Sequence, residues 1–318
     1  MLTLTLILAD VKVSGVSYLR YTIMPDSSLS NGFYIDRAYA NFISEILKNE
    51  NLNLKFRYTL DLGQIKDVGK SGSYKLGSDS TIKVPNSSIV GSYFIYSKYA
   101  FLEAKYKSFK IYFGQTYNFW IKQMDEIWSY RFIEKTPTDY FSVLSSADLG
   151  VAFEYNSKLI NVNFGVFNGE GYNKIEDNKF KDLELTISTY PFISNDLKIG
   201  LFGYGHYGKY KNENEKIRLN SSLAIIQKFF TLSFEYSNFK GSTLTSQDTI
   251  SSNIISGFVS IKPIQTFDII FRIDRYGEDR NFIIGGLVLN LSKNLRGSIN
   301  YKQDKDNKFI NLQTEIKF

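Results

Sequence analysis

One stretch that decides the fold is Leu52-Asn53-Leu54-Lys55-Phe56-Arg57-Tyr58-Thr59-Leu60-Asp61, in which apolar and polar side chains alternate without a break. Successive side chains of a β-strand point to opposite faces. The stretch therefore predicts a strand with one apolar and one charged face. The same alternation returns at 160–166, 230–236 and 310–318.

About sixteen segments of this kind follow one another along the chain, most of them roughly 10 to 14 residues long. A tilted strand that crosses a bilayer needs about 9 to 11 residues, whereas strands of soluble proteins average about 5 to 6 residues. The segment lengths therefore favour an all-β transmembrane antiparallel barrel of about sixteen strands.

The connections between the segments support a barrel independently. Tight links such as 48–49, 157–158 and 292–293 alternate with long polar links such as 63–92 and 118–146. Short periplasmic turns at one rim and long external loops at the other are typical of outer-membrane barrels. A soluble β-sandwich is the alternative, but its Greek-key connections would mix the loop lengths.

Composition excludes several classes of protein. The chain has 318 residues, 16% of them aromatic, no cysteine and a single histidine, His206. Its longest apolar run, Leu2–Ala9, is too short for a membrane-spanning helix. Without cysteine, disulfides, thiolate zinc sites and cysteine nucleophiles are impossible. We therefore expect no metal, no cofactor and no catalytic residue, and the dispersed net charge of +6 argues against nucleic acid as a partner.

The N-terminal residues 1–9 read MLTLTLILA, an apolar stretch that ends in a small residue before Asp10. We interpret this stretch as a residual signal peptide, and residues 10–318 as a single barrel domain. The alternative is a genuine first strand or a frayed end. On the signal-peptide interpretation, the mature chain leaves the cytoplasm.

Aromatic side chains are placed where a barrel meets the membrane–water interface. Phe318 ends the chain on the apolar face of the last segment, and this resembles the assembly signal of bacterial outer-membrane barrels. Tyrosines near segment ends are predicted to form the two aromatic belts: Tyr21, Tyr106, Tyr155, Tyr190, Tyr236, Tyr276 and Tyr301.

A series of short motifs occurs in a characteristic order. Phe113-Gly114-Gln115 closes a strand, Arg131-Phe132-Ile133-Glu134 lies in the long connection, and Asp148-Leu149-Gly150-Val151 and Phe167-Asn168-Gly169-Glu170-Gly171 follow. In this order and spacing the chain resembles the phosphate-selective porin O/P family. The resemblance implies a homotrimer of sixteen-stranded channels in the bacterial outer membrane, in contact with its lipid. It also implies that 118–146 is a third external loop folded into the lumen.

The composition of 118–146 agrees with a position inside the barrel. The segment is too apolar to extend into water, yet it lacks the alternation of a strand. It must therefore pack against a surface, either the inner wall or, alternatively, the outside of the barrel or a subunit contact. We expect this constriction loop to narrow the pore through Lys122, Tyr130, Arg131, Glu134 and Lys135.

Strand parity predicts which charged residues face the lumen: Lys55, Arg57, Lys110, Glu154, Glu184, Arg218, Glu235, Arg272 and Arg296. Over all segments, parity places twelve positive and nine negative groups on the polar face. This excess predicts a weak anion preference. The family's Lys-Pro after the Gly-Gln pair is replaced by Thr116-Tyr117, so tight phosphate binding is not expected.

The sequence thus predicts a passive porin for small hydrophilic solutes or anions. Two alternatives stay open at this point. One is a barrel-embedded outer-membrane enzyme that uses His206 with a nucleophile and an acid near the outer rim. The other is a structural or adhesin barrel whose lumen is plugged.

Overall fold

The computed structural model describes residues 11–25, 31–64, 73–76, 80–83, 93–172, 174, 176, 178–241 and 251–318. The expected signal peptide, 1–9, lies outside the described residues. None of the helices in the described ranges is long and apolar enough to cross a membrane.

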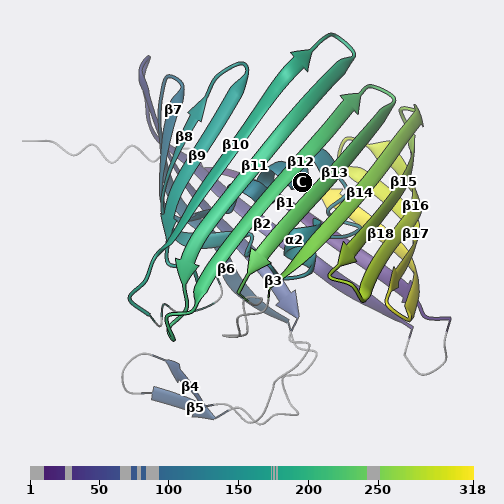
Figure 1. Ribbon diagram of the computed structural model, residues 1–318, viewed down its shortest axis with the longest axis horizontal. Helices are drawn as coiled ribbons and strands as arrows, with labels where there is room; N and C mark the ends of the chain where they lie inside the picture. The colour runs from purple at the N-terminus through teal and green to yellow at the C-terminus, as the bar shows by residue number, and fades with distance from the viewer. Residues whose placement is uncertain are drawn as a thin grey trace, which may run out of the picture.

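Within these ranges sixteen antiparallel strands close into one barrel (Figure 1). They are β1 (Val11–Ile23), β2 (Gly32–Lys48), β3 (Leu52–Gln64), β6 (Tyr93–Tyr106), β7 (Phe109–Tyr117), β8 (Ala147–Asn156), β9 (Ile160–Phe167), β10 (Asp182–Ile193), β11 (Leu197–Lys209), β12 (Glu215–Gln227), β13 (Phe230–Lys240), β14 (Ser251–Ile264), β15 (Phe267–Tyr276), β16 (Arg280–Ser292), β17 (Leu295–Asp304) and β18 (Asn307–Lys317). Each strand pairs with its neighbours in chain order, and β1 pairs with β18. The prediction of an antiparallel barrel of about sixteen strands is confirmed.

Barrel closure depends on a close approach between the two ends of the chain. The amide of Gly15 donates to the carbonyl oxygen of Phe318 at 2.8 Å, and the amide of Phe318 donates back at 3.1 Å. The Phe318 ring lies over Gly15, where a Cβ atom would come within 2.2 Å of Phe318 Cζ. The C-terminal aromatic residue therefore requires a glycine on β1.

The two rims of the barrel differ. At one rim every turn is two or three residues long, as between β6 and β7 or between β10 and β11 (Figure 1, upper rim). The longer connections lie at the opposite rim, as the sequence predicted. A separate two-stranded sheet, β4 (Ser73–Leu76) with β5 (Ser80–Lys83), interrupts the connection from β3 to β6 and was not predicted.

The two faces of the wall have opposite chemistry. On β15, Ile269, Phe271 and Ile273 point outward and are each more than 40% exposed, whereas Arg272 and Asp274 point inward and are buried. Leucine, isoleucine and phenylalanine occupy outward positions on strand after strand. An exposed apolar band is stable against lipid chains, and closure leaves no unpaired strand edge in the lipid.

Five of the seven tyrosines predicted for the outer belts lie on the outer face: Tyr21, Tyr106, Tyr155, Tyr236 and Tyr301. The prediction is wrong for the other two. Tyr190 turns inward against Phe202, with ring centroids 5.8 Å apart, and Tyr276 turns inward against Phe141 at 5.0 Å. Both rings fill space in the lumen rather than anchoring the barrel at an interface.

Candidate functional site

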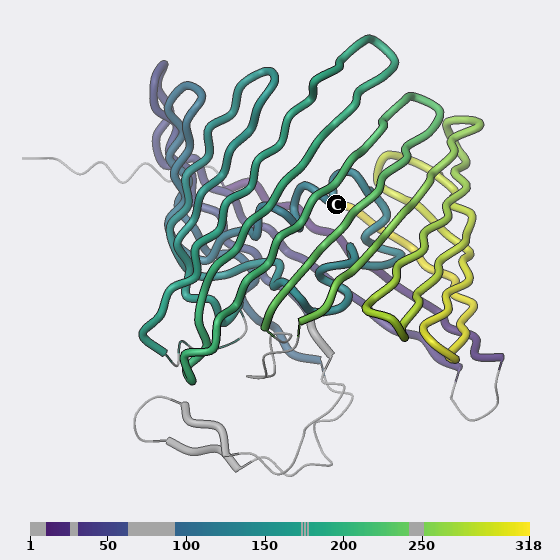
Figure 2. The backbone as a smooth tube through the Cα atoms, in the orientation of Figure 1, coloured from purple at the N-terminus to yellow at the C-terminus, as the bar shows by residue number. Residues whose placement is uncertain are grey.

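The connection between β7 and β8 runs inside the ring of strands (Figure 2). It contains two helices, α1 (Phe119–Trp128) and the single turn α2 (Pro137–Tyr140). The Asn118 side chain caps α1 by accepting from the amide of Ile121 at 3.0 Å, and Ser129 ends the helix with a left-handed φ of 60°. The sequence analysis predicted no helix here, although Asn118 followed by apolar residues at helical spacing is a signal that could have identified one.

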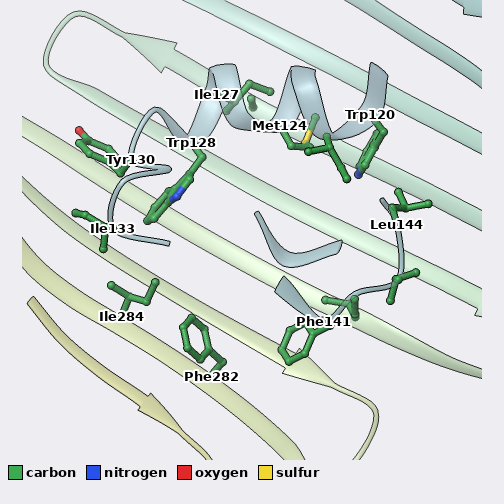
Figure 3. Close-up of a cluster of buried hydrophobic side chains, with 14 of the residues drawn as sticks. Trp120, Met124, Ile127, Trp128, Tyr130, Ile133, Phe141, Leu144, Phe282 and Ile284 are labelled. Atoms are coloured by element: carbon green, nitrogen blue, oxygen red, sulfur yellow. The ribbon is translucent and has the colours of Figure 1, made fainter. Parts of the chain in front are cut away.

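Apolar packing holds α1 against the inner wall (Figure 3). Trp120 lies beside Tyr204 of β11, with ring centroids 5.9 Å apart, and Trp128 contacts Phe258 of β14 edge-on at 5.0 Å. Met124 is also buried in this cluster. The apolar side chains of the segment thus find their partners inside the barrel, and the prediction that the third loop folds into the lumen is confirmed.

Hydrogen bonds to the wall fix the part of the segment that follows α1. The Tyr130 hydroxyl lies 3.0 Å from a carboxylate oxygen of Asp268, and the Tyr140 hydroxyl lies 2.7 Å from Asp304. Gln313 Nε2 donates to the carbonyl oxygen of Phe132 at 2.8 Å. These contacts tie the segment to three strands of the wall, β15, β17 and β18.

Arg131 joins the two halves of the segment. Its Nη1 lies 2.7 Å from the Asp125 carboxylate on α1, and its Nη2 lies 2.6 Å from the Asp139 carboxylate on α2. Burial alone would raise the pKa of Asp139, but Lys135, Arg131 and Lys98 together lower it below the usual range. Burial outweighs Arg131 at Asp125 and raises the pKa of that carboxyl.

A second ion pair ties the segment to β17. Lys302 Nζ lies 3.0 Å from the Glu134 carboxylate and also donates to the carbonyl oxygen of Ile133. Burial would raise the pKa of Glu134, but Lys302, the Lys135 amide and Arg272 lower it below its ordinary value. Glu134 is therefore charged at neutral pH.

Three cavities adjoin the segment. Two of them, called the larger and the smaller cavity below, have volumes of about 690 Å³ and about 330 Å³. A third, of about 650 Å³, lies at the short-turn rim beside Tyr130, Asp268 and Arg296. The larger cavity is lined by residues of the segment, β1, β2, β3, β6 and β16 to β18: Tyr18, Arg20, Asp36, Arg37, Leu62, Phe94, Tyr96, Arg131, Phe132, Ile133, Glu134, Lys135, Tyr140, Phe282, Lys302, Phe309 and Asn311. The smaller cavity lies between α1 and β7 to β12, with Lys122, Gln123 and Asn163 among its lining.

Two β-bulges bring charges into the lumen that strand parity alone did not reveal. Asp36 is the extra residue where β2 pairs with Tyr18 and Leu19 of β1, and Lys98 is the extra residue where β6 pairs with β3. Gln115 Nε2 donates to the carbonyl oxygens of Ser97 and Lys98, both at 2.8 Å, and so fixes the second bulge. The Gly-Gln pair of the sequence motif therefore has a structural role here.

Lys98 and Arg57 lie on the inner face of the barrel wall. Among the described residues, neither has a carboxylate within ion-pair distance. Lys98 Nζ donates to the Tyr39 hydroxyl at 3.0 Å and is 3% exposed. Arg57 donates to Tyr117 at 2.7 Å and to Asn41 at 2.8 Å. Tyrosine rings adjoin both cations, which are thus stabilised by the ring faces.

The structure separates the residues expected at the constriction. Arg131, Glu134 and Lys135 line the larger cavity, whereas Lys122 lines the smaller one. Tyr130 is 2% exposed, packs edge-on against Trp128, and lines the third cavity together with Arg296.

The six lysines and arginines that strand parity assigned to the lumen all lie on the inner face, but two of them are buried. Lys55, Arg57, Lys110 and Arg296 keep part of their surface exposed. Arg218 and Arg272 are 3% and 1% exposed. Arg218 is buried within the polar network of His206. Arg272 lies under the Trp128 ring and donates to the Lys135 carbonyl oxygen at 2.6 Å, so it supports the loop. Neither residue lines the larger or the smaller cavity.

His206 lies on the inner face of β11 within a buried polar network. Its Nε2 is 2.8 Å from Asp182 and its Nδ1 is 2.7 Å from Arg218 Nη1. Lys216 bonds the same Asp182 carboxylate at 2.9 Å and the Gly169 carbonyl oxygen at 3.1 Å. Both ring nitrogens are thus engaged, Nε2 by Asp182 and Nδ1 by Arg218.

Together these features define a transmembrane β-barrel with a polar, partly filled lumen. No protein-family model matches the chain, and no curated protein sequence does either. Solved structures do share the fold. OmpF of Salmonella typhi, in a complex with daunomycin, is 10% identical over 98% of both chains, with a TM-score of 0.68.

Two further solved barrels are similar over nearly their whole length. The trimer form of OmpT, an outer membrane protein of Vibrio cholerae, is 13% identical over 98% of this chain and 99% of that one, with a TM-score of 0.59. A mutant of the Rhodopseudomonas blastica porin is 7% identical over 97% and 100%, with a TM-score of 0.58. At these identities the likeness shows a shared sixteen-stranded porin fold.

Proposed function

We propose that this chain is a porin of the bacterial outer membrane, a passive diffusion channel for small hydrophilic solutes. The observation that carries the proposal is the set of three cavities, about 690, 650 and 330 Å³, around 118–146 in a barrel with an apolar outer face. A solute that enters from the long-loop rim would meet the larger cavity first and pass the segment around Arg131. The segment would act as the constriction.

The charges around the larger cavity support a weak anion preference. Its lining supplies five cations, Arg20, Arg37, Arg131, Lys135 and Lys302, and the lining and its ion-pair partners supply five carboxylates, Asp36, Asp61, Asp125, Glu134 and Asp139. Lys98 lies outside this lining but interacts electrostatically with Arg131 and Arg37, and it adds a sixth cation. The excess is one positive charge. A low-dielectric wall focuses the field of such an excess, but strong selectivity needs a ring of one sign.

The two alternative functions are less well supported. An enzyme would need a free nitrogen on His206, and both are occupied. A plugged barrel would need a filled lumen, and the larger cavity is of the size that holds a small solute. Membership of the phosphate-selective O/P family stays a hypothesis that rests on the order of the motifs.

A homotrimer is also part of the proposal. Small side chains gather on the outer face of β1 and β2, where Ser17 pairs with Ala38 and Gly15 pairs with Ala40. Ala100 of β6 also points outward, on the far side of Leu60 and Tyr58 of β3. In lipid, helices associate through such small residues because they permit close backbone approach, and the same physics applies to barrel walls. We expect Ala40→Leu to shift the detergent-solubilised protein from trimer to monomer in native mass spectrometry, while Leu223→Ala, on the far outer face, leaves the trimer intact.

Conductance in a planar bilayer tests the proposal. The reconstituted protein is expected to give open, ohmic current steps, and deletion of 122–140 is expected to enlarge each step. A reversal potential under a KCl gradient would report a slight anion preference. Absence of current steps would refute the channel, and unchanged conductance in the deletion variant would refute the constriction. A clear cation preference would refute the charge assignment.

A further inference from the structure

The lumen contains aromatic rings that a purely water-filled channel does not need. Phe94 lies on the inner face of β6 and is 45% exposed at the larger cavity. Its ring lies 5.3 Å from that of Tyr96, centroid to centroid, and the Tyr96 hydroxyl meets Arg37 Nη1 at 2.8 Å. An apolar ring, a phenol and a guanidinium thus follow one another along this wall.

A second aromatic wall borders the same cavity. Tyr140, from the segment inside the barrel, packs on Phe282 of β16 with ring centroids 4.3 Å apart. Phe309 of β18 also lines the cavity and is only partly buried. Lumen walls of porins are polar, so exposed phenylalanines on two sides of one cavity call for an apolar contact that water does not provide.

Some cations of the larger cavity keep N–H donors that no carboxylate binds closely. Arg20 and Arg131 each bind a carboxylate at 2.8 Å or less. Lys135 has a looser partner, because its Nζ lies 3.7 Å from Asp139 and its side chain is 37% exposed. Arg37 bonds Asp61 and Tyr96 through Nη1, and its Nη2 has no hydrogen-bond partner among the described residues. Two donors therefore remain available next to the rings.

From this arrangement we infer that the larger cavity is a binding subsite for aromatic carboxylates. The carboxylate of the solute would bind Lys135 or Arg37 Nη2, and its ring would lie against Phe94 or Phe309. Such a solute would bind through charge-assisted hydrogen bonds and ring contacts together. Phosphate and acetate carry the charge but no ring, and neutral sugars carry no charge, so each of these solutes is expected to bind more weakly. The inference rests on the proposed function and names a preferred class of solute for it.

The test compares the block of chloride current by benzoate, acetate and phosphate in the reconstituted protein. Benzoate in the millimolar range is expected to interrupt the open current, and the other two anions at equal concentration to leave it steady. Phe94→Leu keeps an apolar side chain but removes the ring, and we expect it to raise the half-blocking benzoate concentration roughly fivefold or more. Phe33→Leu, at an outer-face position that is 85% exposed, is the matched control and should not change it.

A second measurement separates this inference from the channel itself. Saturation-transfer NMR of benzoate on the detergent-solubilised barrel is expected to give a signal that Phe94→Leu and Lys135→Met both reduce and Phe33→Leu retains. Equal block by all three anions, or an NMR signal unchanged in Phe94→Leu, overturns the subsite even if the channel conducts. A barrel that binds benzoate but gives no current steps refutes the porin proposal and leaves the subsite standing.

Discussion

Removal of the Arg131 guanidinium should release the segment inside the barrel. Arg131→Met leaves the buried Asp139 carboxylate and the partly buried Asp125 carboxylate without the cation that binds them at 2.6 and 2.7 Å. Breaking a buried ion pair costs about 3 to 5 kcal/mol. Because the Asp125 side chain is 22% exposed, we take the lower end of this range, about 3 kcal/mol. About 1.4 kcal/mol changes an equilibrium constant tenfold. The equilibrium constant for local opening of the segment should therefore rise roughly a hundredfold.

The expected readout is open-channel noise, because a loosened segment fluctuates across the pore. The wild-type current should be quiet at pH 7.5 and at pH 4.5. The lowered pKa of Asp139 stabilises the folded state above the unfolded pKa, and that contribution is lost only as the pH falls through the lower folded value. In Arg131→Met the pKa of both carboxyls rises, so the current should flicker at pH 7.5 and become quieter at pH 4.5.

Two further variants make this prediction sharp. Lys122→Met removes a cation of the same segment whose partner Glu126 lies 3.7 Å away, and both side chains are exposed. Exposed pairs contribute about 0 to 1 kcal/mol, so this control should stay quiet. The triple variant Arg131→Met, Asp125→Asn, Asp139→Asn removes the stranded charges and should flicker less than the single variant. Equal noise in wild type and Arg131→Met at both pH values would refute the reasoning.

Two other substitutions test the closure of the barrel and its selectivity. Gly15→Val should weaken the folded, heat-modifiable band on a gel, because an added Cβ atom would lie 2.6 Å from the backbone carbonyl oxygen of Tyr39 as well as against the Phe318 ring. Gly203→Val, where nothing lies within 4 Å of an added Cβ, should fold normally. Lys98→Met should move the reversal potential under a KCl gradient toward cation preference, since it removes a lumen charge that lacks a carboxylate partner among the described residues. Lys48→Met, at the exposed short-turn rim, should leave the potential unchanged, and an equal shift in both variants would argue against a role for the Lys98 charge.

The barrel itself follows from local sequence. When one face of a strand meets lipid and the other meets water, alternation such as that of Leu52 to Asp61 determines which side chains point outward. A strand displaced by one residue would place Lys55 and Arg57 in the hydrocarbon, where a charge costs about 2 to 4 kcal/mol. Segment length and the alternation of turn and loop then set the number of strands and the rim at which each connection lies.

The contents of the lumen were decided only by tertiary contacts. The sequence analysis did not identify the bulges at Asp36 and Lys98. Two adjacent polar residues interrupt the alternation at each, but a bulge is defined only once two strands are paired. The apolar composition of 118–146 predicted that it packs against a surface, and the family resemblance implied the inner wall. Its exact position there depends on partners more than 100 residues away, such as Asp268 for Tyr130. Whether a lumen cation is covered, as Arg272 is, or open, as Lys135 is, depends on where that segment lies, and strand periodicity carries no information about it.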